Sequence, residues 1–342
     1  MKSLGSYTFD EITNQTYAWA EALEMVRSQR EKIDQLKHSP AERVVFTGCG
    51  STHYLSLSAA ALYQELTGQP ASAVTGGELL LNPQIALTRQ RTTLVAISRS
   101  GTTTETVRAV EQFKATGLGP VVVITNYESP LADLGDIRIV IPAGQEQSVA
   151  QTRSFASMYV AAGAFCALSA GREDLLAALE GLPTAGMRLL QHYDALAKNT
   201  GENLSYDRFY FLGSGIRYGL ACEVNLKMKE MTLTHSEPFH FLEFRHGPMS
   251  MVTENAVIVG MLSEKNLGHE QAVLNEMQAR GGKILSLAES GADVSFESGV
   301  PESMRGVLYL PVLQLMAYYR SLAKGLDPDR PNNLVAVVKL NL

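Results

Sequence analysis

The sequence predicts an α/β protein of two tandem lobes, each a doubly wound parallel sheet, behind an N-terminal helical arm. Three observations predict it: apolar strands alternate with helices from residue 43 onward, the same order starts again near residue 207, and 342 residues exceed what one core usually serves. Strands and helices in this alternation form parallel sheets covered on both faces. We therefore expect the arm at 1–40, the first lobe at 41–180, and the second lobe with its C-terminal tail at 200–342.

The arm and the first lobe follow from periodicity. Residues 9–37 place apolar side chains at roughly helical spacing among charges, which predicts one or two amphipathic helices. Within the first lobe, apolar runs that end in glycine or polar turn residues predict four strands, at 43–50, 92–98, 120–126 and 137–144. The stretches between and after them predict three helices, at 51–66, 103–117 and 154–171.

The second lobe repeats this order. A strand ending in glycine at 207–215 resembles residues 43–50 and precedes a helix that starts near Leu220. Further strands are expected at 255–262 and 283–289, and the apolar stretch 306–325 is interpreted as a fourth strand with its closing helix. The two halves match in architecture rather than residue by residue, which indicates an old duplication.

Composition excludes several classes of protein. The formal net charge is -6 without any Lys/Arg block, which argues against a nucleic-acid surface. The first residues lack the apolar core of a signal peptide, and the longest apolar-leaning run, residues 160–170, is too short to span a membrane. A cytoplasmic protein is expected. The three cysteines have no CxxC spacing and no His/Cys/Asp cluster has metal-ligand spacing, so neither a metal nor a cofactor is expected.

One polar stretch stands out at the predicted junction of a strand with a helix. In "SRSGTTTET" hydroxyl side chains surround Gly101, and a similar turn, "GCGST", follows the first strand. Hydroxyls and free N–H groups at a helix N-terminus are suited to bind a phosphate, and in such sheets ligands lie beyond the carboxyl ends of the strands. The same residues are also typical of an ordinary helix cap with additional polar turn residues. The pattern therefore predicts a phosphate site with a capping turn as its alternative.

A second group of polar residues lies on the helix that begins the second lobe. Glu223, Lys227 and Glu230 are spaced by four and three residues, so they project from one face. A carboxylate there could move a proton between carbons next to a carbonyl, and the ammonium could stabilise the resulting oxyanion or pair with Glu223. The alternative is a solvated helix face with ordinary ion pairs.

Four segments together resemble the sugar isomerase (SIS) family, whose lobes are flavodoxin-like. They are "SRSGTTTET", "GCGST", "AGQEQSVAQTRSF" (143–155) and "ACEVNLKMKEMTLTHSEPFHFLEFRHGPMSMV" (221–252). They are similar to the isomerase half of glucosamine-6-phosphate synthase. The stand-alone amino-sugar-phosphate deaminases and isomerases of the galactosamine-6-phosphate and tagatose-6-phosphate type are closer still.

The resemblance implies roles for individual residues. The sugar 6-phosphate would be bound by the two loops, through Gly50, Ser51, Thr52, Ser98, Ser100 and Thr103, with Arg99 in the place of a family glutamine. Val149 and Gln151 would touch the sugar, and Glu223 and Lys227 match the remaining polar positions of the catalytic helix. Glu230 would transfer the proton between C1 and C2, and His246 would open the ring. In the family this histidine reaches across to the partner subunit, which implies a homodimer.

Two departures from the synthase shape the expected activity. The glutaminase domain has no counterpart, so no glutaminase activity is expected, and the lysine of the synthase tail is replaced by Ala336, with Lys339 three residues on. The expected function is a sugar-phosphate isomerase or deaminase acting on a hexosamine 6-phosphate by proton transfer between C1 and C2, with ammonia release. The alternatives are a fructosamine-6-phosphate deglycase and a non-catalytic sugar-phosphate-binding regulator.

Overall fold

The computed structural model describes residues 3–38, 41–338 and 340, and the chain forms two compact units. The unit of the first lobe contains residues 14–38, 41–146, 153–180, 335–338 and 340. The unit of the second lobe contains residues 3–13, 147–152 and 181–334. The arm is thus divided after Thr13. The segment 147–152 belongs to the unit of the second lobe, and residues 335–338 and 340 of the tail belong to the unit of the first lobe. The simpler boundaries expected from the sequence stay a prediction.

The first lobe is built on five parallel strands in the order β2-β1-β3-β4-β5. The strands are β1 (Arg43–Gly48), β2 (Ala71–Thr75), β3 (Thr92–Ser98), β4 (Val121–Thr125) and β5 (Ile137–Val140). Their Val- and Ile-rich runs suit a sheet that is buried on both faces. Because β1 and β3 are neighbours in register, with Phe46 opposite Val95, the turns that follow them leave the same edge of the sheet.

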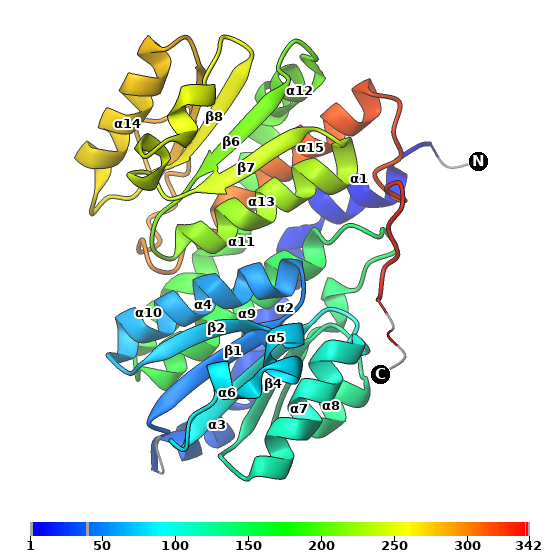
Figure 1. Cartoon of the computed structure of the whole chain (residues 1–342), viewed down its shortest axis with the longest axis vertical. Coiled ribbons are helices and arrows are strands. Elements are labelled where there is room, and N and C mark those ends of the chain that lie inside the picture. The colour runs from blue at the N-terminus through cyan, green and yellow to red at the C-terminus, as the bar shows by residue number, and fades with distance from the viewer. Residues whose placement is uncertain (1–2, 39–40, 339, 341–342) are drawn as a thin grey trace. The chain divides into compact units, whose positions relative to one another are not determined.

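Helices cover both faces of this sheet (Figure 1). One layer contains α2 (Gln15–Ser28), α3 (Arg30–His38), α4 (Ser51–Thr67) and α9 (Arg153–Ser169), and the other contains α5 (Gly76–Leu81), α6 (Pro83–Ala86), α7 (Thr104–Thr116) and α8 (Pro130–Leu134). Helix α9 is apolar on all sides and buried along nearly its whole length, as expected for a helix packed between other helices and a sheet. A short helix, α10 (Glu173–Ala178), follows it.

The second lobe repeats the first. Its parallel sheet has the order β10-β9-β8-β6-β7, which, read from β7, is the strand order of the first lobe. The strands are β6 (Arg208–Leu212), β7 (His235–Phe239), β8 (Ala256–Met261), β9 (Lys283–Ala288) and β10 (Val294–Ser295). One layer holds α1 (Ser6–Thr13), α11 (Leu182–His192), α12 (Asp194–Glu202), α13 (Arg217–Thr232) and α15 (Leu310–Ala323), and α14 (Leu267–Ala279) lies on the other face (Figure 1). The predicted fold class is confirmed.

Several elements differ from the expectation, among them β10, which lies at Val294–Ser295 although the fourth strand of the second lobe was expected near residue 306. The edge strands β2 and β7 were not expected, because β2 lacks large apolar residues and β7 contains Pro238, which an edge strand tolerates. The strand expected at the start of 306–325 is wrong: residues 306–309 form a 3-10 turn, and α15 follows with Pro311 in its first turn. A short apolar run fits a buried strand and a buried helix equally, so periodicity alone could not separate them.

The N-terminal arm is helical, as expected, and its parts pack on different elements. Helix α1 lies against α15, where the Phe9 and Tyr318 rings are 5.3 Å apart, and Asp329 accepts hydrogen bonds from the Thr8 N–H and hydroxyl at 2.7 Å each. Helix α2 packs on α9. Across the described ranges, every helix is too short or too polar to cross a bilayer.

Candidate functional site

The loop that follows β3 is held by its own hydroxyl groups. The Ser98 Oγ accepts a hydrogen bond from the Gly101 N–H at 3.1 Å, and the Ser100 Oγ accepts from the Thr102 N–H at 3.2 Å. Gly101 has φ +62°, and a Cβ there would lie 1.9 Å from the Ser129 Oγ. The loop therefore needs glycine at this position, both for its backbone conformation and for its close packing.

The turn after β1 lies on the same sheet edge and places Thr52 at the start of α4. Its buried hydroxyl donates to the Cys49 carbonyl and accepts from the Cys49 N–H, both at 3.0 Å. Gly50 precedes the helix with φ +59°, and a Cβ at Gly48 would lie 2.5 Å from the Thr52 Oγ1. The sequence therefore brings the two predicted phosphate-binding turns together within the first lobe.

Helix α7 presents an open N-terminus to this edge. Thr103 is its N-cap residue with extended backbone, and its side chain makes no capping bond. No described residue accepts a hydrogen bond from the N–H of Thr103 or Thr104. Free N–H groups and the positive end of the helix dipole together favour an anion.

Arg99, the one cation of this loop, is engaged by the protein. Its guanidinium is buried and donates to the carbonyl oxygen of Ala336 at 2.9 Å, and its Nη1 lies 3.6 Å from the Glu146 Oε2. The Glu146 side chain is fully buried and also accepts hydrogen bonds from the N–H and hydroxyl of Ser154. Arg99 thus connects the loop to the C-terminal tail. Nothing in the sequence pattern indicated the pairing with Glu146.

The C-terminal tail also contacts the loop region through a second bond. The Leu340 N–H donates to the Thr104 Oγ1 at 3.1 Å. Lys339, three residues beyond the position of the family lysine, lies outside the described residues.

In the second lobe, α13 carries the predicted row of charges. The Lys227 Nζ lies 2.6 Å from the Glu230 Oε2 and 3.4 Å from the Glu223 Oε1. The Lys227 and Glu223 side chains are 2% and 1% exposed, whereas that of Glu230 is 21% exposed. Burial of the Glu223 and Lys227 charges is costly unless they compensate each other, so this is not an ordinary solvated helix face. Glu230 is the member of the row that solvent or a substrate can reach.

His246 lies apart from this row. It follows a 3-10 turn (Glu243–Arg245) and precedes Gly247, whose φ is +120°. The residue is exposed, and none of the described side chains bonds to its imidazole. The structure does not bring His246 into contact with Glu223, Lys227 or Glu230 within the described part of the chain.

Val149 and Gln151 belong to the short segment that packs with the second lobe. The Val149 N–H donates to the Asp329 carbonyl at 2.9 Å, and the Gln314 Nε2 donates to the Thr152 carbonyl at 3.3 Å. The Gln151 Oε1 is buried and has no hydrogen-bond partner among the described residues. It is an acceptor that a ligand hydroxyl could satisfy.

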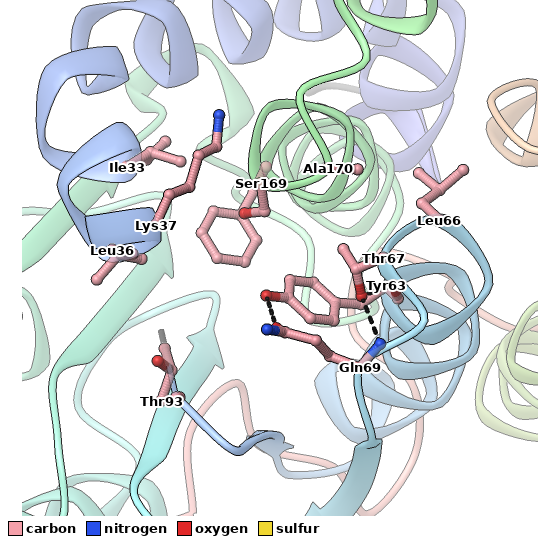
Figure 2. Close-up of a pocket in the computed structure, with 12 residues that line it drawn as sticks. Ile33, Leu36, Lys37, Tyr63, Leu66, Thr67, Gln69, Thr93, Ser169 and Ala170 are labelled. Carbon is pink, nitrogen blue, oxygen red and sulfur yellow. Dashed lines mark hydrogen bonds between the residues drawn. The ribbon is translucent and has the colours of Figure 1, made fainter. Parts of the chain in front are cut away.

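A separate cavity of about 270 Å³ lies in the first lobe, near the amino ends of β1 and β3 (Figure 2). Figure 2 shows the Tyr63 hydroxyl, which donates to the Gln69 Oε1 at 3.1 Å, and burial raises the pKa of Tyr63 to about 12. None of the predicted site residues lines this cavity. Since ligands of such sheets bind at the opposite, carboxyl edge, we do not assign the cavity to the predicted site.

No group of three or more His, Cys, Asp or Glu side chains within 3–38, 41–338 and 340 is arranged to hold a metal ion. The described residues offer a loop with hydroxyl groups and open N–H groups, a buried carboxylate–ammonium row and an exposed imidazole.

Curated proteins similar to this chain are longer than it. It is 28% identical over 331 residues to glutamine–fructose-6-phosphate aminotransferase (isomerizing) of Methanothermobacter thermautotrophicus, covering 94% of this chain and 54% of that protein. It is 29% identical over 354 residues to the enzyme of the same name from Acidithiobacillus ferridurans, covering 96% and 58%. The chain thus spans about half the length of the curated relatives it matches.

Solved structures of its own length are also similar. A putative tagatose-6-phosphate ketose/aldose isomerase from Clostridium novyi superposes with a TM-score of 0.89 at 25% identity, covering 100% of this chain and 99% of that one. Glucosamine-6-phosphate deaminase from Thermotoga maritima superposes with a TM-score of 0.79 at 25% identity, covering 98% and 100%.

The family comparison agrees with both lobes. The SIS domain matches residues 38–168 and again residues 205–319, which is one match for each parallel sheet. The relatives above are named for reactions of sugar phosphates. By these matches, which cover most of its length, the chain belongs to the SIS domain family.

Proposed function

We propose that the protein is a sugar-phosphate aldose–ketose isomerase or deaminase that acts on a hexosamine 6-phosphate. The observation that carries the proposal is the buried row on α13, in which Lys227 lies between two carboxylates and only Glu230 is accessible. The names of the relatives, which include both isomerases and a deaminase, support the same class of reaction.

Glu230 is the base of the proposed reaction. Its carboxylate removes the proton from the carbon next to the carbonyl and returns it to the neighbouring carbon, through an enediol or enolamine. Lys227 holds the Glu230 carboxylate at 2.6 Å and supplies positive charge where the substrate oxygen becomes negative. Glu223 balances that positive charge and keeps Lys227 oriented.

The loop after β3 binds the phosphate in this proposal. Ser98, Ser100 and Thr103 supply hydroxyl groups, and the N-terminus of α7 supplies N–H groups. Thr52, with Gly50 and Ser51, completes the site from the neighbouring turn. Arg99 orders the loop through Ala336 and Glu146 rather than acting as a free phosphate ligand.

The remaining roles are those that the resemblance to the SIS family implies. Val149 and Gln151 contact the sugar chain, where the buried Gln151 Oε1 accepts from a hydroxyl. His246 is exposed and separate from the Glu230 row, which fits a homodimer in which the His246 of each subunit opens the sugar ring in the other. Proton transfer between adjacent carbons requires neither a metal nor a redox cofactor, and the proposal includes none.

Deamination needs only one further step. If C2 carries an amino group, the shift of the proton converts the C1 aldehyde to an alcohol and the C2 amine to an imine. Water then adds at C2 and ammonia leaves, which yields the ketose 6-phosphate. The oxidation of C2 is balanced by the reduction of C1, so no external oxidant or reductant is needed.

The test is proton NMR of the purified protein in D2O with 6-phosphates of glucosamine, galactosamine, glucose, tagatose and fructosamine adducts, with ammonia assayed in parallel. Deuterium incorporation at C1 or C2 with ammonia release identifies a deaminase, and incorporation without ammonia identifies an isomerase. Release of a free amine from a fructosamine adduct identifies a deglycase. Binding of these sugars without any exchange would contradict the proposal and favour the regulator.

A further inference from the structure

The second lobe has its own version of the two turns that form the phosphate site of the first. Gly48 ends β1 and Gly213 directly follows the equivalent strand β6, and a Cβ at either would collide with the residue four positions on. Two residues later, Gly50 and Gly215 have nearly the same φ, +59° and +58°. Arg217 therefore stands in the second lobe where Thr52 stands in the first.

The loop after β8 is the counterpart of the loop after β3, since β3 and β8 are the central strands of their sheets. Each loop contains a serine, Ser98 or Ser263, whose Oγ accepts the N–H of the residue three positions later. The two loops differ in what their other N–H groups contact.

In the second lobe, the loop amides are satisfied by carboxylates of the same lobe. The Ser263 N–H donates to the Glu270 Oε2 at 2.6 Å. The N–H groups of Glu264 and Lys265 both donate to the Glu302 Oε2, at 3.1 and 3.3 Å. The amides that would face a ligand phosphate therefore already have an anionic acceptor.

The second oxygen of that acceptor meets a buried cation. The Glu302 Oε1 accepts from the Arg217 Nη1 at 2.7 Å, and Arg217 is only 4% exposed. Glu302 thus receives two loop N–H groups and one guanidinium N–H, which is a set of donors that proteins commonly offer to a phosphate or sulfate.

The carboxylate of Glu270 holds the Arg217 guanidinium in position and does not occupy the place of the Glu302 carboxylate. The Glu270 Oε1 lies 3.9 Å from the Arg217 Nη2, and Glu270 is itself buried. The Glu302 side chain is 22% exposed, whereas those of Arg217 and Glu270 are 5% and 3% exposed. Glu302 is therefore the member of this group that lies towards solvent, on the side from which a ligand would enter.

We propose that Glu302 fills, from within the chain, a second oxyanion site in the second lobe, and that this site binds a phosphate-sized anion when the carboxylate is removed. The inference rests on the proposed function only in taking the first-lobe loop as the site of the sugar phosphate. It explains why a duplicated fold would bind one sugar phosphate per chain.

The experiment measures thermal unfolding in inorganic phosphate and in chloride at equal ionic strength. The double variant S100A/T103A, which weakens the first-lobe site, is compared with S100A/T103A/E302A. We expect phosphate to raise the melting temperature of the triple variant by at least about 2 °C more than that of the double variant. Equal shifts would overturn the inference.

Two further variants locate the effect. Adding R217M to the triple variant removes the cation but keeps an apolar side chain of similar length, so the response to phosphate should disappear. E302Q in place of E302A keeps a side chain in the site, so the response should be absent there too. A response that survives R217M would place the anion elsewhere and contradict the inference.

Failure to fold would still be informative. If the triple variant is insoluble in chloride, it is refolded in phosphate and in chloride side by side. Recovery in phosphate alone supports the inference, and recovery in neither or equally in both contradicts it. Failure of the first-lobe proposal has a different signature, because wild type and S100A/T103A would then respond alike to phosphate.

Discussion

The loops after β3 and β8 leave the central strands of two sheets with the same strand order, yet they present different surfaces. In the first lobe the N–H groups at the start of α7 have no described acceptor, and hydroxyl side chains surround them. In the second lobe the amides of Ser263, Glu264 and Lys265, in the loop that precedes α14, donate to Glu270 and Glu302. The difference teaches that the fold supplies the position of an anion site, and a few side chains decide whether a ligand can enter it.

The helices that follow β1 and β6 differ in the charges they bury, and here it is the second lobe that carries the polar group open to a ligand. Helix α4 buries small and hydroxyl-bearing residues such as Ser56, Ser58 and Ala59, whereas α13 buries Glu223 and Lys227 beside the accessible Glu230. We infer a division of labour between the lobes, with phosphate binding in the first and proton transfer in the second. The predictions below test this division, beginning with the largest expected effect.

Glu230→Gln removes the base and keeps the size of the side chain. We expect kcat to fall by about 10² to 10⁴, since general-base catalysis typically contributes that much, while affinity for the sugar phosphate stays unchanged. Steady-state kinetics and calorimetric binding measure the two quantities. The matched control is Glu254→Gln, an exposed carboxylate of the same lobe, which should keep full activity. A Glu230→Gln enzyme with wild-type turnover would remove the second lobe from catalysis.

Ser100→Ala and Thr103→Ala each remove a hydroxyl from the open loop. We expect KM to rise by about tenfold or more per substitution with little change in kcat, because hydrogen bonds to charged groups contribute about 1.5–3 kcal/mol. The control is Ser263→Ala, whose Oγ accepts from the Asn266 N–H in the closed loop of the second lobe. If Ser263→Ala raised KM as much as Ser100→Ala, the contrast between the lobes would fail.

Gly50→Ala and Gly215→Ala form a matched pair, because both positions have a positive φ and open space where a Cβ would go. Each substitution should lower the free energy of unfolding by about 1–3 kcal/mol through backbone strain alone. Only Gly50→Ala should also raise KM, since Gly50 belongs to the open site. Chemical denaturation and kinetics of both variants check this, and equal changes in KM would argue against it.

Two histidines whose pKa is lowered give the smallest expected effect, one in each lobe. Burial lowers the pKa of His53 in α4 and of His240, whose ring stacks on Tyr218 at 3.9 Å. A lowered pKa in the folded protein means that the unfolded chain binds the proton more readily. The contribution of each neutral imidazole to the free energy of unfolding is therefore fully present above about pH 6.5 and is lost as pH falls through the folded-state pKa.

The variants His53→Gln and His240→Gln should therefore each flatten the loss of stability on the acid side of pH 6.5, with little change above it. Denaturant unfolding measured from pH 5 to pH 8 tests this. An unchanged slope in both variants would show that neither imidazole contributes.

Local sequence predicted a candidate site wherever one short stretch of chain contains all of the residues of that site. Ser98, Gly101 and Thr103 lie within six positions of each other, and the row from Glu223 to Glu230 lies on one helix, so the strand-to-loop and helical spacings predicted both groups. Their roles in binding and catalysis stay predictions. The ion pairs Arg99–Glu146 and Arg217–Glu302 were missed, because they join residues far apart in the chain. An arginine two residues after the Gly-Ser-Gly turn at 213–215 was the available signal for the second pair.

Local sequence is enough to specify the two α/β lobes, their Gly-rich turns and the face shared by Glu223, Lys227 and Glu230, since strand and helix periodicity act over a few residues. Long-range packing sets which charges are buried, which hydroxyls and amides remain open, and that Glu302 reaches the loop after β8. Those properties depend on side chains that folding brings together from distant positions, and no local pattern encodes them.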